Sequence, residues 1–270
     1  MLQPEDYKEP SCPFCKDFYN PAPDKQQGSI PVPVIIQKLD EYLNKEDYKG
    51  AKKHLDYWIA EAKMLNDRRG ELSLLSEMMG LSRRLNDKIS GLDSVRRGFE
   101  IIETEGLQNN VSAATIWLNG ATTLKAFGHA AEGLAYYERT LELYNKQIEP
   151  NDERFGGLYN NYALACADVG QLEKAKELYE KAIIIMSKQK NGALEVAITY
   201  LNMAQLYEDT DEEIENLLEK AYEKLNDPQP PRDGYYAFVC RKCAPTFDYY
   251  GHFAIKEELN KRADEIYARA

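Results

Sequence analysis

The sequence predicts an all-α fold built from repeated helix hairpins. The first observation is a run of apolar residues at the spacing of one helix face, from Tyr159 to Cys166. The second is Gly170, which interrupts this run before the same spacing resumes from Leu172 to Ala182. The third is that the pattern returns along the chain, so each hairpin is one unit of a repeat array.

Six repeats begin near residues 32, 72, 114, 156, 197 and 237, which are 40, 42, 42, 41 and 40 residues apart. The first residue of each repeat is numbered position 1. Glycine then stands at position 15 of the third, fourth and sixth repeats, where a turn between two helices is expected. The residues that define the repeats are, in chain order, Leu39, Tyr42, Ala51, Leu55 and Trp58; Met78, Met79, Gly91, Val95 and Gly98; Trp117, Ala121, Gly128, Gly133 and Tyr137; Tyr159, Tyr162, Ala163, Gly170, Ala175, Tyr179 and Ala182; Tyr200, Met203, Ala204, Tyr207, Leu217, Leu218 and Ala221; and Ala244, Phe247, Gly251 and Ala263.

This placement of aromatic, small and glycine residues resembles the tetratricopeptide repeat (TPR) family, most strongly in the three central repeats. The usual TPR period is about 34 residues, and the longer period is similar to that of kinesin light chains. The resemblance implies a right-handed superhelix of about six repeats over residues 31–270, with the first helix of each repeat on the concave surface. Residues 1–30 are predicted to form a proline-rich N-terminal tail.

The charge of the chain disfavours two classes of partner. It has 34 Lys and Arg against 45 Asp and Glu, a net charge of −11, whereas nucleic acids and anionic membranes bind clustered positive charge. No apolar run approaches the ~20 residues of a membrane span, and the N-terminus shows no secretion signal. We therefore expect a cytoplasmic protein that binds neither nucleic acid nor membrane. The resemblance to the TPR family also includes peptide receptors of bacteria.

Neither enzyme chemistry nor a cofactor is expected. The three histidines, His54, His129 and His252, stand at no fixed spacing from a nucleophile. No HExxH, GxSxG or GxxxxGK[ST] motif occurs. Acidic residues on helical segments such as 212–225 are expected to lie on solvated faces with partners one turn away.

Two Cys-x-x-Cys pairs are the only candidates for a metal or thiol site. Cys12 and Cys15 lie in the tail, whereas Cys240 and Cys243 occupy positions 4 and 7, which belong to the core of a repeat. Buried thiols at such positions act as small apolar groups. A zinc site shared by both pairs would require the tail to cross the whole array, so we expect no metal. A metal or disulfide at the tail pair alone is left open.

The concave surface offers the strongest functional signal. In the family, positions 2, 5, 6, 9, 12 and 13 face the groove, and position 6 is asparagine in three successive repeats. A carboxamide both donates and accepts hydrogen bonds, so a ladder of asparagines can hold the main chain of an extended peptide, as in kinesin light chains. The asparagines could instead tie neighbouring helices together. The predicted groove residues are Asn119, Asn161, Asn202, Arg84, Lys125, Asn160, Gln205 and Glu208.

The resulting hypothesis is a non-enzymatic scaffold that binds an extended peptide or protein segment. Capture of a chaperone C-terminus is not expected, because the clamp of Lys at position 5 and Asn at position 9 is absent. One alternative is an oligomerisation module, a homo-oligomer formed through the aromatic last repeat; another is a zinc- or thiol-dependent protein. The aromatic residues in question are Tyr235, Tyr236, Phe238, Phe247, Tyr249, Tyr250 and Phe253.

Overall fold

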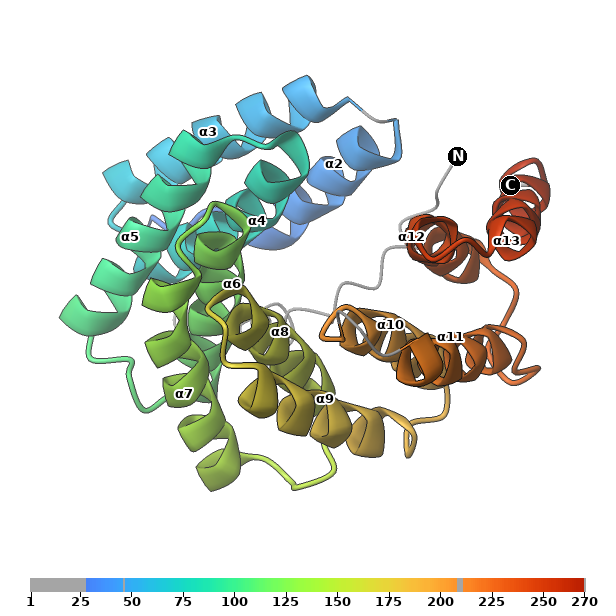
Figure 1. Cartoon of the computed structure of the whole chain (residues 1–270). Coiled ribbons are helices and arrows are strands. Elements are labelled where there is room, and N and C mark those ends of the chain that lie inside the picture. The colour runs from blue at the N-terminus through green and yellow to red at the C-terminus, as the bar shows by residue number, and fades with distance from the viewer. Residues whose placement is uncertain (1–27, 46, 208–210, 270) are drawn as a thin grey trace. The chain divides into compact units, whose positions relative to one another are not determined.

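The structure, a computed structural model, describes residues 28–45, 47–207 and 211–269. All regular secondary structure in these ranges is helical, as the sequence predicts (Figure 1). The helices are α2 (Val32–Asn44), α3 (Tyr48–Met64), α4 (Arg68–Leu85), α5 (Lys88–Thr104), α6 (Val111–Ala126), α7 (Ala130–Gln147), α8 (Arg154–Asp168), α9 (Leu172–Met186), α10 (Ala193–Ala204), α11 (Asp211–Leu225), α12 (Gly234–Tyr249) and α13 (Phe253–Tyr267). None of them is long and apolar enough to cross a membrane.

Contacts divide these helices after Ile148 into two compact units. The N-terminal unit contains the hairpins α2–α3, α4–α5 and α6–α7, and the C-terminal unit contains α8–α9, α10–α11 and α12–α13. In each unit, successive hairpins also pack on one another, for example α4 on α6 and α10 on α12. The predicted hairpins are therefore present. The single array over 31–270 stays a prediction, and most of the predicted tail lies outside the described residues.

The turn within each hairpin follows the predicted register. Position 15 adopts the left-handed conformation at Gly128 (φ 85°), Gly170 (φ 77°) and Gly251 (φ 84°). Glycine adopts it without a steric penalty. In the second repeat the same position is Asn86, with φ 53°, and asparagine is the residue that most readily replaces glycine there. The turn thus requires a left-handed backbone at position 15, which explains why glycine or asparagine stands there in these repeats.

Aspartate side chains begin several of the helices. The carboxylates of Asp47, Asp67, Asp87 and Asp233 accept hydrogen bonds from main-chain N–H groups in the first turn of α3, α4, α5 and α12. Such caps satisfy donors that a helix leaves unpaired at its start. Asp67 also accepts from the N–H of Ile30 at 3.0 Å. This bond fixes the start of the described chain against the connection between α3 and α4.

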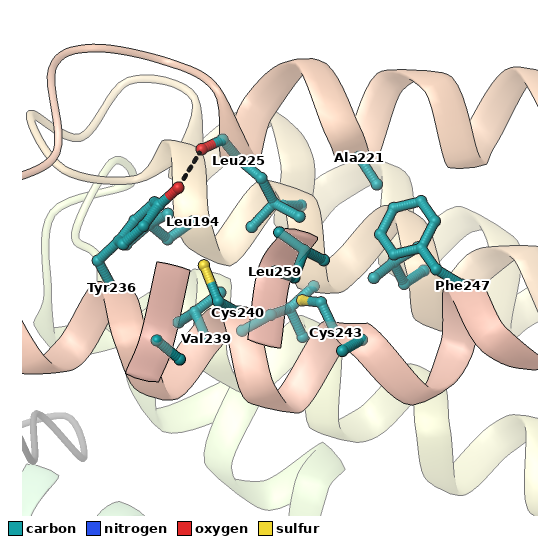
Figure 2. Packing of buried hydrophobic residues seen from close by; sticks show 14 of the residues in the cluster. Leu194, Ala221, Leu225, Tyr236, Val239, Cys240, Cys243, Phe247 and Leu259 are labelled. Atoms are coloured by element: carbon teal, nitrogen blue, oxygen red, sulfur yellow. Dashed lines mark hydrogen bonds between the residues drawn. The ribbon is translucent and has the colours of Figure 1, made fainter. Parts of the chain in front are cut away.

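One core cluster of the C-terminal unit is formed by aliphatic, small and aromatic residues of α10 to α13 (Figure 2). Tyr236 and Phe247 on α12 are fully buried, and the hydroxyl of Tyr236 donates to the carbonyl oxygen of Leu225 at 3.2 Å. Leu259 and Ala263 bring α13 into the same cluster. Burial of these apolar surfaces is the main force that holds the hairpins together.

A buried ion pair joins the second hairpin of the N-terminal unit. The Glu71 side chain on α4 is only 1% exposed, and Arg97 on α5 donates to both its oxygens at 2.6 and 2.9 Å. Arg68 adds a third contact at 2.9 Å. Burial by itself would raise the pKa of Glu71, but the hydrogen bonds from the two arginines lower it below the ordinary value. The expectation that acidic residues lie on solvated faces is wrong at this position.

Two tyrosines at position 24 provide a matched test of packing. The Tyr137 hydroxyl lies 3.1 Å from Oγ1 of Thr122, whereas the buried Tyr179 hydroxyl has no hydrogen-bond partner in the described part of the chain. The residue of the fourth repeat that corresponds to Thr122 is Leu164, which has no polar group. Tyr179→Phe should therefore raise the free energy of unfolding by ~1 kcal/mol, and Tyr137→Phe should lower it by a similar amount. Urea denaturation of both variants measures this, and a loss of stability in Tyr179→Phe would contradict the assignment.

Candidate peptide-binding site

In the N-terminal unit, the first of the three asparagines ties two helices together. Asn119 on α6 donates from Nδ2 to the hydroxyl of Ser76 on α4 at 2.8 Å. Arg83 links the same two helices, since its guanidinium donates to Oγ1 of Thr123 at 2.8 Å and to the main-chain carbonyl oxygen of Asn119 at 3.4 Å. The bond joins position 6 of one repeat to position 5 of the repeat before it.

The C-terminal unit contains the same arrangement two repeats further along the chain. Asn202 on α10 donates from Nδ2 to Oδ1 of Asn160 on α8 at 3.1 Å, and these residues again stand at positions 6 and 5. Both asparagines are half-buried. The bond uses one of the two N–H groups of Asn202, so the second N–H and the carbonyl oxygen are not consumed by it. Two of the three asparagines thus take part in ties between repeats.

Asn161 on α8 differs from the other two. It is half-buried, and its side chain has no hydrogen bond within the described ranges. The residue at position 5 of the preceding repeat is Leu118, which has no polar atom in its side chain. Of the three position-6 asparagines, Asn161 is therefore the one whose whole carboxamide can meet a ligand. The sequence shows Leu118 at this position, but only the hydrogen bonds of Asn119 and Asn202 to position-5 side chains reveal what this residue implies for Asn161.

The remaining predicted groove residues lie on several helices. Arg84 is exposed in the last turn of α4, and its guanidinium lies 5.6 Å from the Tyr48 ring centre. Lys125 is half-buried in the last turn of α6. Gln205 is exposed at the end of α10. Glu208 lies outside the described residues. The two cations and Asn119 belong to the N-terminal unit, whereas Asn160, Asn161, Asn202 and Gln205 belong to the C-terminal unit.

The cysteine pair of the last repeat is part of the core. Cys240 and Cys243 on α12 are 0% and 2% exposed and lie among apolar side chains (Figure 2). Burial raises the pKa of both thiols, so the reactive thiolate form is disfavoured. Among the described residues, no group of three or more His, Cys, Asp or Glu side chains could hold a metal. Cys12 and Cys15 lie outside the described residues.

This burial gives a direct prediction for thiol chemistry. In the native protein, Cys166, Cys240 and Cys243 should resist an aromatic disulfide reagent at neutral pH, because all three are buried. The same thiols should react fully in denaturant. Mass spectrometry of the labelled protein assigns the sites, and Cys12 and Cys15 serve as internal comparison. Rapid native labelling of Cys240 or Cys243 would contradict their place in the core.

The aromatic residues of the last repeat are mostly accounted for by packing. Tyr236 and Phe247 are buried, and Tyr235, Phe238 and Tyr250 pack against the core of the C-terminal unit. Tyr249 and Phe253 are the two that stay exposed, at 82% and 63%. The patch available for self-association is therefore smaller than the seven aromatics suggest.

The histidines do not form a catalytic arrangement. His129 and His252 each lie beside one glutamate, Glu132 at 2.7 Å and Glu215 at 3.1 Å, and a ring nitrogen of His54 lies 3.0 Å from the carbonyl oxygen of Ile35. The His129 contact lies within the first turn of α7, the other two join neighbouring helices, and none of the three contacts includes a nucleophile. What the described residues offer chemically is hydrogen bonding and charge on helix faces.

The helix pairs and their register define a helical-repeat protein, the class whose members generally act as protein-interaction scaffolds. The tetratricopeptide repeat profile matches residues 155–227, so this part of the chain consists of tetratricopeptide repeats, and the fold is that of TPR proteins.

Solved structures agree with this fold. BtubC (BKLC) from P. vanneervenii is similar at 19% identity with a TM-score of 0.63, over 75% of this chain and 84% of that one. A second similar structure is a point variant of a Podosopora anserina protein with nearly identical TPR-like repeats of the kinesin light chain type. Its identity to this chain is 17% and its TM-score 0.50, over 73% of this chain and 95% of that one. No curated protein matches the sequence significantly.

Proposed function

We propose that the protein is a non-enzymatic scaffold whose first helices bind an extended peptide or protein segment. The tetratricopeptide repeats support a role in protein interaction. The observation that carries the finer proposal is the half-buried Asn161, whose carboxamide has no partner in the described part of the chain. Its N–H groups and carbonyl oxygen match the C=O and N–H of one peptide group.

The other two asparagines have a dual role in this proposal. Their bonds to Ser76 and Asn160 hold adjacent first helices in register. Each keeps a carbonyl oxygen and one N–H group for a ligand. A peptide main chain is then bound at Asn161 and supported at Asn202 of the same unit, largely independently of its side chains. In the C-terminal unit, Gln205 and Glu208 would select among the side chains of the bound segment, and Arg84 and Lys125 are the predicted contacts of the N-terminal unit.

Panning of a random peptide display library on the full chain tests the proposal. We expect enrichment of extended peptides on the wild-type protein and loss of that enrichment on an Asn161→Ala variant. The matched control is Asn151→Ala, at an exposed asparagine in the connection before α8. Failure to enrich any peptide on the wild-type protein, or equal enrichment on Asn161→Ala, would count against the proposal.

A further inference from the structure

A cleft in the N-terminal unit lies apart from the positions predicted for the groove. It has a volume of about 510 Å³ and is formed by the end of α5, the α5–α6 connection, α6 and the second half of α7. This volume is within the range of ~300–1,000 Å³ that is common for small-molecule sites. No lining residue stands at position 2, 5, 6, 9, 12 or 13 of its repeat. The lining residues are Glu103, Gln108, Asn109, Trp117, Arg139, Glu142, Leu143 and Lys146.

Hydrogen bonds hold the wall of the cleft in place. Gln147 on α7 donates from Nε2 to the carbonyl oxygen of Asn109 at 2.6 Å, and Gln108 donates to the carbonyl oxygen of Glu103 at 3.3 Å. The apolar part is formed by Trp117 and Leu143, which are 5% and 6% exposed. Because this wall is already ordered, ligand binding carries a smaller entropic cost than it would at a mobile connection.

Charges of both signs surround this apolar part. Arg139, Glu142 and Lys146 lie along one face of α7 at spacings of three and four residues, which normally favour ion pairs. Nevertheless, within the described ranges these three side chains and that of Glu103 make no ion pair or side-chain hydrogen bond. The Arg139 guanidinium lies 6.0 Å from the Trp117 ring centre and 5.4 Å from that of Tyr136. Two cations and two carboxylates are thus available to a ligand.

We propose that this cleft binds a small zwitterion of the size of an amino acid or a dipeptide. The ligand carboxylate would lie toward Arg139 and Lys146, its ammonium toward Glu103 and Glu142, and its apolar side chain toward Trp117. Arg139 and Lys146 lie ~10 Å apart along α7, with Glu142 between them. An anionic ligand would therefore be repelled by Glu142, and a cationic ligand would be repelled by the two cations. A zwitterion can pair with both kinds, and charge-assisted hydrogen bonds are the strongest that such a site offers.

The test uses the dipeptide Ala-Leu together with its N-acetylated and C-amidated forms. Trp58 and Trp117 are the two tryptophans of the chain, so in a Trp58→Phe variant the fluorescence reports Trp117. We expect a saturable change with Ala-Leu and at least ~10-fold weaker binding of either capped form, since each cap removes one charge-assisted bond. Titration calorimetry on the wild-type protein gives the same comparison without a substitution.

Two variants locate the site. Glu142→Gln, which leaves Glu103, should reduce the preference for Ala-Leu over its N-acetylated form, and Arg139→Gln, which leaves Lys146, should reduce the preference over the amidated form. Lys181→Gln, at an exposed lysine on α9, is the control and should leave both preferences unchanged. The absence of saturable binding of Ala-Leu by both methods, or equal binding of the capped forms, would overturn the proposal. Because no groove position is involved, these outcomes are independent of the peptide proposal above.

Discussion

Replacing Glu71 by Ala is expected to lower the free energy of unfolding by ~3–5 kcal/mol. The substitution removes a carboxylate that is 1% exposed and leaves Arg97 without the partner that accepts from two of its nitrogens. Removal of one member of a buried ion pair typically costs this much, and here Arg97 and Arg68 both lose the carboxylate oxygens that accept their hydrogen bonds. Urea denaturation followed by circular dichroism measures the effect.

The matched control is Glu100→Ala. Glu100 also accepts from Arg97, at 2.9 Å, but its side chain is 57% exposed. An exposed pair contributes ~0–1 kcal/mol, so this variant should unfold close to the wild type. Equal losses in Glu71→Ala and Glu100→Ala would show that burial of Glu71 does not determine its contribution.

The pH dependence follows from the direction of the Glu71 pKa. The native pKa is lowered below that of the unfolded chain, where a glutamate titrates at about 4.3. The contribution of Glu71 to stability is therefore fully present above the unfolded pKa and is lost as the pH falls from there through the native pKa. Between neutral pH and mildly acid pH above this window, the Glu71 contribution should stay constant.

The second large effect is expected in the groove. If Asn161 and Asn202 each make about two hydrogen bonds to a peptide main chain, Asn161→Ala/Asn202→Ala should weaken peptide binding by ~2–4 kcal/mol, or about 30- to 1,000-fold. The core positions 4, 7, 8 and 11 are untouched by the change. Fluorescence anisotropy with a peptide from the display selection gives the dissociation constants of both proteins.

The same double variant should also melt at a lower temperature. Asn202 is hydrogen-bonded to Asn160, so part of the effect falls on packing between α8 and α10. The Asn160→Ala variant provides the comparison, because it breaks the same bond and leaves Asn202 in place. A lower melting temperature with unchanged peptide affinity in the double variant would mean that Asn202 acts only as a structural tie and that Asn161 does not contact the peptide.

The helix hairpins could be predicted because their signals are local. Helical spacing around Tyr162 and the glycine at position 15 act within one hairpin, and the structure has both. The core placement of Cys240 and Cys243 follows from the same register. Repetition strengthens such signals, since each new copy tests the same positions again.

Contacts between side chains of different helices were harder to predict. The partners of Asn119 and Glu71 lie 43 and 26 residues away, and whether Ser76 or Arg97 reaches them depends on how neighbouring helices pack. The cleft beside Trp117 has no motif, because its residues come from a connection and from three helices that meet only in the fold. The break in contacts after Ile148 also has no counterpart in the repeat spacing.

The most direct test of the scaffold proposal compares two single variants. Peptide affinity and melting temperature should be measured on Asn161→Ala and Asn202→Ala with the same selected peptide. We expect Asn161→Ala to keep the wild-type melting temperature and to bind the peptide about 5- to 150-fold more weakly, because two hydrogen bonds are lost. Asn202→Ala should lower the melting temperature as well. Unchanged peptide affinity in a fully folded Asn161→Ala protein would contradict the proposal that the Asn161 carboxamide binds the peptide main chain.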